Sequence, residues 1–446
     1  MTAGSNPVEH LGQLVDYFRQ GETPRAQWRV GTEHEKIGIF RDSGARVPYE
    51  GERGIGVVLE RIANRDGWER IEEAGLTIGL GKDGANISLE PGGQLELSGA
   101  PLATCVETCR EFSRHVELVK RESADLGIDW LALGIDPIHK TSEIPRMPKS
   151  RYRIMRDYLP QRGDRALDMM HATATVQANF DFSDEADMAK KLRMAMACTP
   201  ITSAIFANAS ISRGKPNGFA SERVQIWRSV DPDRCGILPF VFAADFGYEQ
   251  YAEWALDVPM FFVVRNAAYH PADGMTFRQF FEKGFEGFRP TLDDWNLHLT
   301  TVFPEIRLKQ FIEVRGTDCV APDLICALPA LWKGLFYDEQ ACATAWELAG
   351  AWKQEDFEAC LSSAARRGLG GSVAGRPMLT WARELLEIAR EGLARMAAEG
   401  FADERSFLEP IDALLEQGKS PGEVILERWQ GEWAGSIDRL IDFARY

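Results

Sequence analysis

The chain has 446 residues and a mass of 49.9 kDa, which allows one large elaborated domain or two fused parts. Its formal net charge of −16, with no stripe of Lys and Arg, argues against nucleic-acid binding. Hydrophobic residues make up 45% and charged residues 26%, as in folded proteins. No apolar run could span a bilayer and no basic-then-apolar signal opens the chain, so we predict a cytoplasmic protein without nucleic-acid or membrane partners.

The first predicted elements are helices over residues 8–20, 54–73 and 102–126, where apolar residues recur at helical spacing. Between them lie strand-like runs. The sequence GLGKDG at 79–84 matches the G-x-G-x-x-G dinucleotide pattern, but strand-like residues rather than a helix follow it. Because Asp-Gly is a strong hairpin signal, we interpret Asp83-Gly84 as a turn.

The sequence changes character near residue 330. After this point apolar residues keep helical spacing, as in the segment LTWARELLEIAREGLARMAAEG at 379–400, and no alternating run remains. We therefore predict a catalytic sheet domain over residues 1–330 and a helical region over 331–446 packed on the same domain. The glycine-rich segment at 366–377 is expected to be a loop.

Four segments alternate between apolar and polar residues, as strands do in an antiparallel sheet with one solvated face. They cover residues 29–40, 92–99, 173–182 and 307–316. Because side chains two residues apart share a face, each segment has a polar side and an apolar side. The polar sides carry four acids, an amide and a guanidinium: Glu33, Glu35, Glu96, Glu313, Gln177 and Arg315.

For one strand alone, an exposed polar surface is the simpler interpretation. Four such faces together favour a cation site, because clustered carboxylates repel one another unless a cation lies among them. Oxygen ligands without His or Cys spacing indicate Mg²⁺ or Mn²⁺, and magnesium suggests the phosphates of ATP. A non-catalytic acidic protein that binds cations is the alternative from another class.

Longer segments resemble the plant-type glutamate–cysteine ligases, a family also found in proteobacteria. They include GTEHEK at 31–36, LEPGGQLELSGAPL at 89–102 and HLTTVFPEIRLKQFIEVRG at 298–316, in order over nearly the whole chain. The resemblance implies the first step of glutathione synthesis, in which ATP phosphorylates the γ-carboxylate of L-glutamate and the amino group of L-cysteine attacks the γ-glutamyl phosphate. It also implies an α+β fold, with a curved antiparallel sheet forming a funnel inside outer helices, similar to the catalytic core of glutamine synthetase.

The resemblance also implies roles for residues on the polar faces. The metal-binding acids of the family match Glu33, Glu35, Glu96 and Glu313, and Gln177 is a weaker candidate ligand or a structural amide. Arg315 matches the residue that stabilises phosphoryl transfer, with Glu313 beside it as the second catalytic candidate. Glu35→Gln or Glu313→Gln is expected to abolish ADP release with little effect on folding.

For the amino-acid substrate, the resemblance points to Arg151 and Arg223 as ligands of the α-carboxylate of glutamate. Trp227, Met260 and Phe261 are candidates for the pocket wall, although bulky apolar residues more often belong to a core. Lys149 and Lys215 are candidates for contacts with the phosphates of ATP, although solvated loop lysines are the simpler interpretation.

The eight cysteines include no CxxC motif and are too sparse for a disulfide scaffold. The resemblance implies a redox-sensitive pair at Cys109 and Cys326, for which two buried thiols are the alternative. The expected state is a monomer or homodimer that binds L-glutamate, L-cysteine and ATP. A carboxylate–amine ligase of the same superfamily with a different amine acceptor is the nearest rival function.

Overall fold

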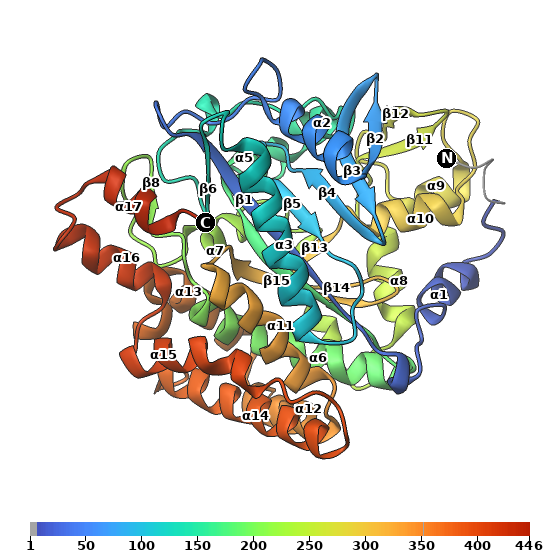
Figure 1. Cartoon of the computed structure of the whole chain (residues 1–446). Coiled ribbons are helices and arrows are strands. Elements are labelled where there is room, and N and C mark those ends of the chain that lie inside the picture. Colours follow the sequence, from blue (N-terminus) through green and yellow to red (C-terminus); the bar gives the residue numbers. More distant parts are fainter. Residues whose placement is uncertain (1–6, 351) are drawn as a thin grey trace.

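The computed structural model describes residues 7–350 and 352–446. At its centre lies an antiparallel sheet that has nine strands within these residues, in the order β14-β15-β7-β1-β5-β4-β3-β2, with β6 paired to the second half of β1 (Figure 1). The strands are β1 (Val30–Phe40), β2 (Glu69–Glu73), β3 (Leu76–Lys82), β4 (Ala85–Leu89), β5 (Leu95–Ser98), β6 (Ile128–Leu131), β7 (Thr175–Phe180), β14 (Ile306–Leu308) and β15 (Ile312–Asp318). The α+β class with an antiparallel sheet and outer helices is therefore confirmed.

Helices and short hairpins surround this sheet. The helices before residue 322 are α1 (Gly12–Arg19), α2 (Ile55–Asp66), α3 (Cys105–Ser123), α4 (Ser150–Tyr158), α5 (Ala166–Ala172), α6 (Glu185–Ile205), α7 (Glu222–Trp227), α8 (Tyr248–Asp257), α9 (Phe277–Lys283) and α10 (Leu292–Leu299). The later helices are α11 (Pro322–Phe336), α12 (Glu339–Ala349), α13 (Gln354–Arg367), α14 (Met378–Ala398), α15 (Glu409–Gln417), α16 (Pro421–Gln430) and α17 (Ile437–Ala444). Short strand pairs are β8 (Ile211–Ser212) with β9 (Lys215–Pro216), β10 (Cys235–Gly236) with β13 (Phe303–Pro304), β11 (Phe262–Arg265) with β12 (Ala268–Pro271), and β16 (Ser372–Val373) with β17 (Arg376–Pro377).

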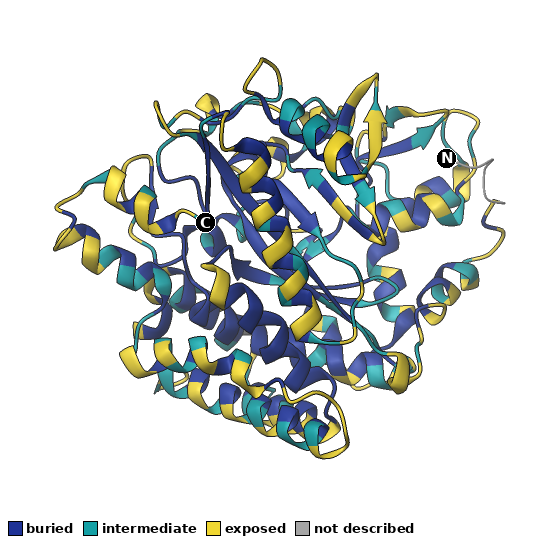
Figure 2. Cartoon of the chain, viewed as in Figure 1, coloured by how far each residue is buried: buried dark blue, intermediate teal, exposed yellow. Residues whose placement is uncertain are grey.

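One face of the sheet packs on the main hydrophobic core. Val176, Ala178 and Phe180 of β7 point to this core, where α11 packs against β7 and α6 packs against the neighbouring β15. Helix α6 is buried on nearly all sides, which explains why its apolar residues do not form a single stripe (Figure 2). The apolar half of the alternation therefore fixes which side of the sheet the helices cover.

The predicted helix over residues 54–73 is wrong in its second half. Helix α2 ends at Asp66, and Gly67 adopts a left-handed conformation with φ of 70°. This is a common way for a helix to end, because glycine has no side chain to oppose that conformation. The chain then forms the edge strand β2 instead of continuing the helix.

The interpretation of GLGKDG as a hairpin is confirmed. Strands β3 and β4 pair on either side of Asp83-Gly84, where the φ angles are 50° and 85°. Two successive positive φ angles are what the tight turn between twisted strands requires. The glycine-rich segment at 366–377, predicted as a loop, is only partly irregular, because it contains the short hairpin β16–β17.

The helical region begins earlier than predicted. The expected boundary at 330/331 falls inside α11, which starts at Pro322 and follows β15 after three residues. Apolar residues on both sides of the expected boundary, from Leu14 to Leu440, belong to one hydrophobic core. The helices therefore extend the sheet domain rather than form a separate core.

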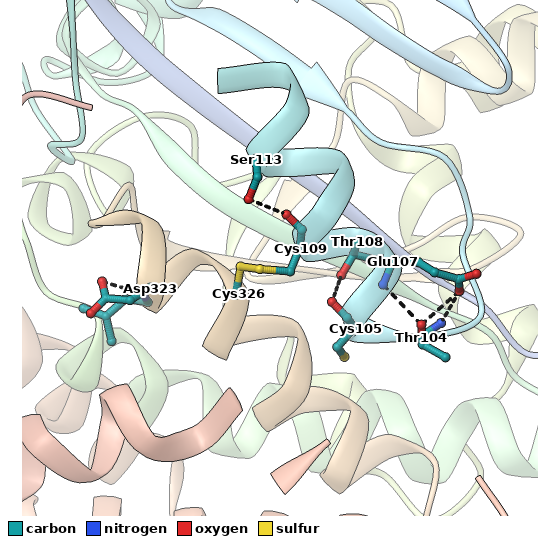
Figure 3. The surroundings of a disulfide bond; sticks show 9 residues. Thr104, Cys105, Glu107, Thr108, Cys109, Ser113, Asp323 and Cys326 are labelled. Atoms are coloured by element: carbon teal, nitrogen blue, oxygen red, sulfur yellow. Dashed lines mark hydrogen bonds between the residues drawn. A yellow bond between two sulfur atoms is a disulfide. The ribbon is translucent and has the colours of Figure 1, made fainter. Parts of the chain in front are cut away.

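Cys109 of α3 and Cys326 of α11 form a disulfide that joins residues 217 positions apart (Figure 3). The same two helices are also held by buried charges. Glu404 accepts a hydrogen bond from the backbone N–H of Cys105 at 2.5 Å, and Lys333 lies 2.6 Å from Glu404. Helix α3 is thus attached to α11 by a covalent bond and, one to two turns away, through Glu404, which pairs with Lys333 of α11 and accepts a hydrogen bond from the first residue of α3.

Reduction of this disulfide is expected to lower the free energy of unfolding by about 2–5 kcal/mol without unfolding the protein. The cross-link closes a long loop and so restricts the unfolded chain, while Lys333 and Glu404 keep α3 docked in the reduced protein. Urea unfolding with and without dithiothreitol measures the effect. Cys109→Ser serves as the control, because reductant should not change its urea midpoint; an unchanged midpoint in the reduced wild type would contradict the expectation.

Candidate functional site

Strand register brings the predicted acids to one face of the sheet. Glu35 pairs with Glu96 of β5, and Glu33 pairs with Gln177 of β7. Glu313 of β15 pairs with Asn179, two residues beyond Gln177 on the same face. Residues paired across antiparallel strands point to the same side, so the four acids and Gln177 share the face opposite the helical core.

A cavity of about 310 Å³ lies over this polar face. Its acidic wall contains Glu33, Glu35 and Glu96, together with Glu90 from the loop between β4 and β5. Cationic residues from other parts of the chain line the same cavity. The other predicted residues in its lining are Gln177, Arg151, Arg223, Trp227 and Arg315.

The acids on the acidic wall repel one another. Burial, and then the charges of Glu90 and Glu33, raise the pKa of Glu96 to about 8. Burial, Glu90 and Glu96 likewise raise the pKa of Glu35 well above its usual value, and burial and Glu313 raise that of Glu33. Each of these three acids accepts a hydrogen bond. Glu33 accepts one from Asn179 Nδ2 at 2.9 Å, and Glu35 accepts one from the N–H of Thr175 at 3.1 Å. Glu96 accepts one from Ser88 Oγ at 2.9 Å.

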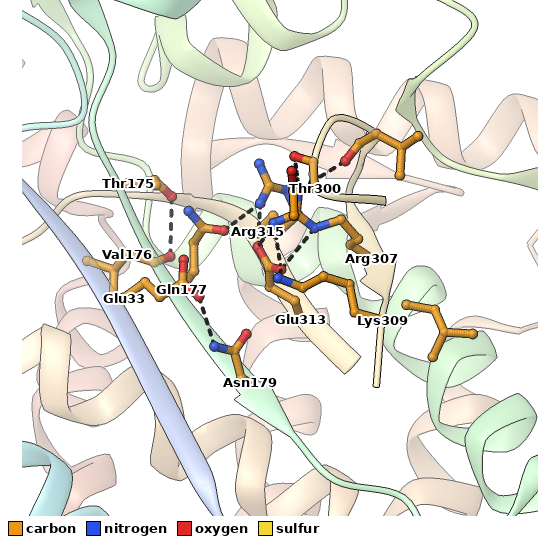
Figure 4. A network of polar contacts seen from close by, with 12 residues as sticks. Glu33, Thr175, Val176, Gln177, Asn179, Thr300, Arg307, Lys309, Glu313 and Arg315 are labelled. Carbon is orange, nitrogen blue, oxygen red and sulfur yellow. Dashed lines mark hydrogen bonds and ion pairs between the residues drawn. The ribbon is translucent and has the colours of Figure 1, made fainter. Parts of the chain in front are cut away.

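Glu313 has different surroundings from the other three acids. It is fully buried, and Arg307 donates two hydrogen bonds to its carboxylate at 2.9 and 2.8 Å (Figure 4). Lys309 Nζ lies 3.5 Å away, and Arg315 Nη1 also donates to it. Burial alone would raise the pKa of Glu313, but these three cations hold that pKa below its ordinary value. Glu313 therefore anchors a group of cations, and the expectation that Glu313→Gln has little effect on folding needs correction.

Arg315 connects strands β15 and β7 on the polar face. Its Nη1 donates to Gln177 Oε1 at 2.8 Å as well as to Glu313. The register between β15 and β7 shifts between Val314 and Thr317, so two residues of β15 oppose one residue of β7. Such a bulge redirects a side chain, and here it lies at the residue predicted to contact the transferred phosphoryl group.

The predicted substrate residues present hydrogen-bond donors without partners. Within the described part of the chain, Arg151 Nε, Arg223 Nε and Trp227 Nε1 are buried and make no hydrogen bond. Arg223 is only 3% exposed, and its Nη2 donates to the carbonyl oxygen of Arg315 at 3.1 Å. A buried donor without an acceptor is costly, so this part of the cavity lining suits an anionic ligand.

Two predicted pocket residues are not brought to this cavity. Met260 is 2% exposed and belongs to the main hydrophobic core. Phe261 packs under the guanidinium of Arg234, 4.0 Å from its ring centre, and borders a different hollow beside α4. The segment that carries both residues leads into β11, which pairs with β12 in a separate two-stranded sheet, and the local sequence did not reveal this.

Some residues of the cavity were not singled out as site residues. Arg307 and Lys309 lie on the same polar face as Glu313 and Arg315, so the alternation of polar and apolar residues was the available signal. Lys149 lines the cavity instead of lying in solvent, and burial lowers its pKa, whereas Lys215 is exposed as expected. Glu90 lies in an irregular loop, where no periodic pattern marks it.

The acidic wall fits a hydrated divalent cation rather than a closed metal site. Among residues 7–350 and 352–446, no three His, Cys, Asp or Glu side chains converge closely enough to hold an ion by themselves. Mg²⁺ usually keeps several waters and binds through a few carboxylates together with substrate phosphates. Burial and neighbouring acids raise the pKa values of Glu35 and Glu96, and a cation among these carboxylates would favour their ionised forms.

Stabilisation of the protein by Mg²⁺ is expected to increase with pH. The pKa of Glu96 is raised from its ordinary value near 4.5 to about 8 in the metal-free fold. The stability that protonated Glu96 contributes is therefore complete below pH 4.5 and is lost as the pH rises through 8. A cation needs the ionised carboxylate and displaces this proton. Thermal unfolding at about pH 6 and about pH 8.5, with and without MgCl₂, should show the larger shift at the higher pH. Glu96→Gln is the control, and equal shifts at both pH values would count against the acidic wall as the cation site.

The sheet and its cavity define an α+β protein that carries a charged small-molecule site on an antiparallel sheet. The model of the family described as Glutamate-cysteine ligase family 2 matches residues 29–442. The chain belongs to this family.

Curated relatives cover almost the whole chain. The chloroplastic glutamate–cysteine ligase of Medicago truncatula is 43% identical over 436 residues, which are 97% of this chain and 84% of that protein. The chloroplastic glutamate–cysteine ligase B of Oryza sativa subsp. japonica is 42% identical over 456 residues, covering 100% of this chain and 90% of that protein. The chain is therefore similar to these enzymes along nearly their full length.

A solved structure supports the fold. The glutamate–cysteine ligase of Francisella tularensis in complex with AMP superimposes with a TM-score of 0.56 at 12% identity, covering 94% of this chain and 87% of that one. At this identity the similarity shows the arrangement of the sheet and helices.

The predicted cytoplasmic location is contradicted by the comparisons. The plant relatives at 42–43% identity are chloroplastic enzymes. Within the described residues no helix is long and apolar enough to cross a membrane. The absence of a recognised signal in this sequence was therefore not a sound basis for assigning a compartment.

Proposed function

We propose that this protein joins the γ-carboxylate of L-glutamate to the amino group of L-cysteine in an ATP- and Mg²⁺-dependent reaction, the first step of glutathione biosynthesis. The observation that carries the proposal is the cavity, whose lining combines a group of carboxylates with arginines that have unpartnered donors. An enzyme that phosphorylates a carboxylate with ATP must hold a cation and two anionic substrates side by side. The carboxylates and the arginines supply these two needs.

Glu33, Glu35 and Glu96 are the residues that would hold Mg²⁺, with Gln177 at the edge of the group. When bound, the ion neutralises phosphate charge and orients ATP. Arg315 donates to Gln177 beside this group of acids, where its guanidinium stabilises charge on the transferred phosphoryl group. Glu313 takes part by fixing Arg315, because its carboxylate accepts the hydrogen bond from Arg315 Nη1.

Arg151 and Arg223 hold glutamate in the same cavity. Their guanidinium groups recognise the α-carboxylate, which leaves the γ-carboxylate directed toward the acidic wall and Arg315. The amino group of cysteine then attacks the γ-glutamyl phosphate, and γ-glutamylcysteine, ADP and phosphate are released. The protein supplies orientation and charge stabilisation and needs no covalent nucleophile. Cys109 and Cys326 are a proposed redox-sensitive pair outside this cavity.

An ADP-release assay tests the proposal. The purified protein is incubated with ATP and MgCl₂, and L-cysteine or L-glutamate is omitted in turn, with mass detection of γ-glutamylcysteine. Product that forms only when both amino acids are present supports the proposal. ADP release with glutamate and another amine, but not with cysteine, would instead favour a related carboxylate–amine ligase.

A further inference from the structure

A small recess opens beside the main cavity, behind Arg223 and Arg315. The two spaces share four lining residues, Arg223, Trp227, Phe303 and Arg315, and the recess adds Glu305 and Gly316. The space in which the centre of a water-sized group can lie has a volume of about 10 Å³. That is room for about one such group, so the recess can take an ammonium group or a water but not a whole substrate.

Glu305 is an acid without a partner in this recess. Its carboxylate makes no hydrogen bond or ion pair with any residue of the described ranges 7–350 and 352–446. Burial raises its pKa, and the charges of Arg223 and Arg315 act in the opposite direction. An added Cβ at Gly316 would lie 2.7 Å from Glu305 Oε2, so the carboxylate packs directly against the β15 bulge that carries Arg315.

The charges around the recess favour a zwitterion over a simple anion. Asp318, Glu35 and Glu305 all act on Arg223 as negative neighbours. These acids balance the two guanidinium groups, whereas a phosphate or second carboxylate entering the recess would meet Glu305. Arg223 and Trp227 line both the recess and the main cavity, and their buried Nε and Nε1 groups have no acceptor among the described residues, so they offer donors to a carboxylate. Donors on the shared lining and an acceptor within the recess match the head of an α-amino acid.

We propose that Glu305 binds the α-ammonium group of glutamate in this recess, while Arg223 and Trp227 hold the α-carboxylate on the shared lining. The proposal rests on the proposed function and adds to it the residue that selects an α-amino acid. The ammonium belongs to glutamate rather than to cysteine for a chemical reason. The amino group of cysteine must be neutral and free to attack the γ-glutamyl phosphate, so it cannot be held as an ammonium ion against a carboxylate.

Glutarate tests this assignment, because it is glutamate without the α-amino group. Kinetics of ADP release are measured with L-glutamate and with glutarate, each with L-cysteine and ATP. The wild type should prefer glutamate strongly, because a site built to bind an N–H group rejects the analogue that lacks it. Glu305→Gln should lower this preference by about tenfold or more, mainly by raising the KM for glutamate, and change the KM for ATP little.

Two further variants separate recognition from a structural role. Glu358→Gln is the matched control, because Glu358 lies close enough to influence Glu305 but is half exposed and paired with Arg228 at 2.9 Å. It should keep the wild-type preference. Glu305→Asp keeps the charge and should retain part of the preference for glutamate over glutarate. If thermal unfolding shows that Glu305→Gln is not folded, Glu305→Asp replaces it in the comparison. If Glu305→Gln lost activity equally with glutamate and with glutarate, so that the ratio between the two substrates did not change, the assignment would be overturned.

Direct binding separates this inference from the proposed function. Titration calorimetry compares L-glutamate and glutarate with the wild type and Glu305→Gln in the absence of ATP. If the wild type forms no γ-glutamylcysteine, the proposed function fails, and calorimetry still decides whether the recess recognises the ammonium group. A glutamate preference that Glu305→Gln removes supports the recess, and the same affinity for both ligands in the wild type refutes it.

Discussion

Glu35→Gln is expected to reduce glutamate-dependent ADP release by at least roughly 100-fold and to leave the protein as stable as the wild type or slightly more stable. In the metal-free fold, the charge of Glu35 is opposed by burial, Glu90 and Glu96, which raise its pKa well above the usual value. Glutamine has the same shape and can still accept the hydrogen bond from the N–H of Thr175. The substitution removes a repulsive charge from the fold and a cation ligand from the reaction.

Steady-state ADP release at several MgCl₂ concentrations, together with thermal unfolding, measures both effects. Glu69→Gln is a suitable control, because Glu69 lies on β2 at the exposed edge of the same sheet. It changes the net charge by the same amount without touching the cavity. Near-normal turnover of Glu35→Gln at limiting Mg²⁺ would refute the role of the acidic wall in binding the cation.

Alternation in the sequence was sufficient to place the acidic face. Glu33 and Glu35 alternate with buried neighbours in β1, and Glu96 and Gln177 do so in β5 and β7, so the period of two settled which side chains share a side. The structure adds the pairing between strands distant in the sequence, which makes four local patterns into one surface. Beyond Glu35, the same face of β1 carries Ile37 and Ile39, where β6 replaces β5 and β7 as the partner strand.

Residues whose surroundings depend on long-range packing could not be placed in this way. Met260 and Phe261 resemble pocket residues locally, but both are packed in hydrophobic cores and their segment leads into the separate sheet of β11 and β12. Glu90 lies in an irregular loop and reaches the cavity only because β4 and β5 pair across it. A helical pattern over 54–73 likewise gave no sign that residues 69–73 find a strand partner in β3.

The role of Glu313 depends on its ion-pair partners, although the sequence placed this residue on the correct face. Alternation put Glu313 on the polar face with the other acids, and the register confirms that placement. Only the pairing of β14 with β15 brings Arg307 directly opposite Glu313. Its carboxylate is therefore neutralised within the protein, whereas those of Glu35 and Glu96 are not.

Glu313→Gln is consequently expected to lower the free energy of unfolding by about 3–5 kcal/mol as well as to abolish activity. The substitution leaves Arg307, Lys309 and Arg315 close together in a buried site without their shared counter-ion. Since the folded pKa of Glu313 is lowered, its stabilising effect is present above the ordinary pKa near 4.5 and is lost as the pH falls toward the folded value. The variant should therefore be most destabilised relative to the wild type near neutral pH.

Urea unfolding of Glu313→Gln at about pH 7 and about pH 4 measures this difference, which should be larger at the higher pH. The double variant Arg307→Met with Glu313→Gln is the informative comparison, because it removes one of the stranded cations and should recover part of the lost stability. It should not recover activity, since Arg315 still lacks the carboxylate that holds it. A urea midpoint for Glu313→Gln equal to that of the wild type would show that the three cations do not depend on this acid, and Glu313 would then be available as a cation ligand like Glu35.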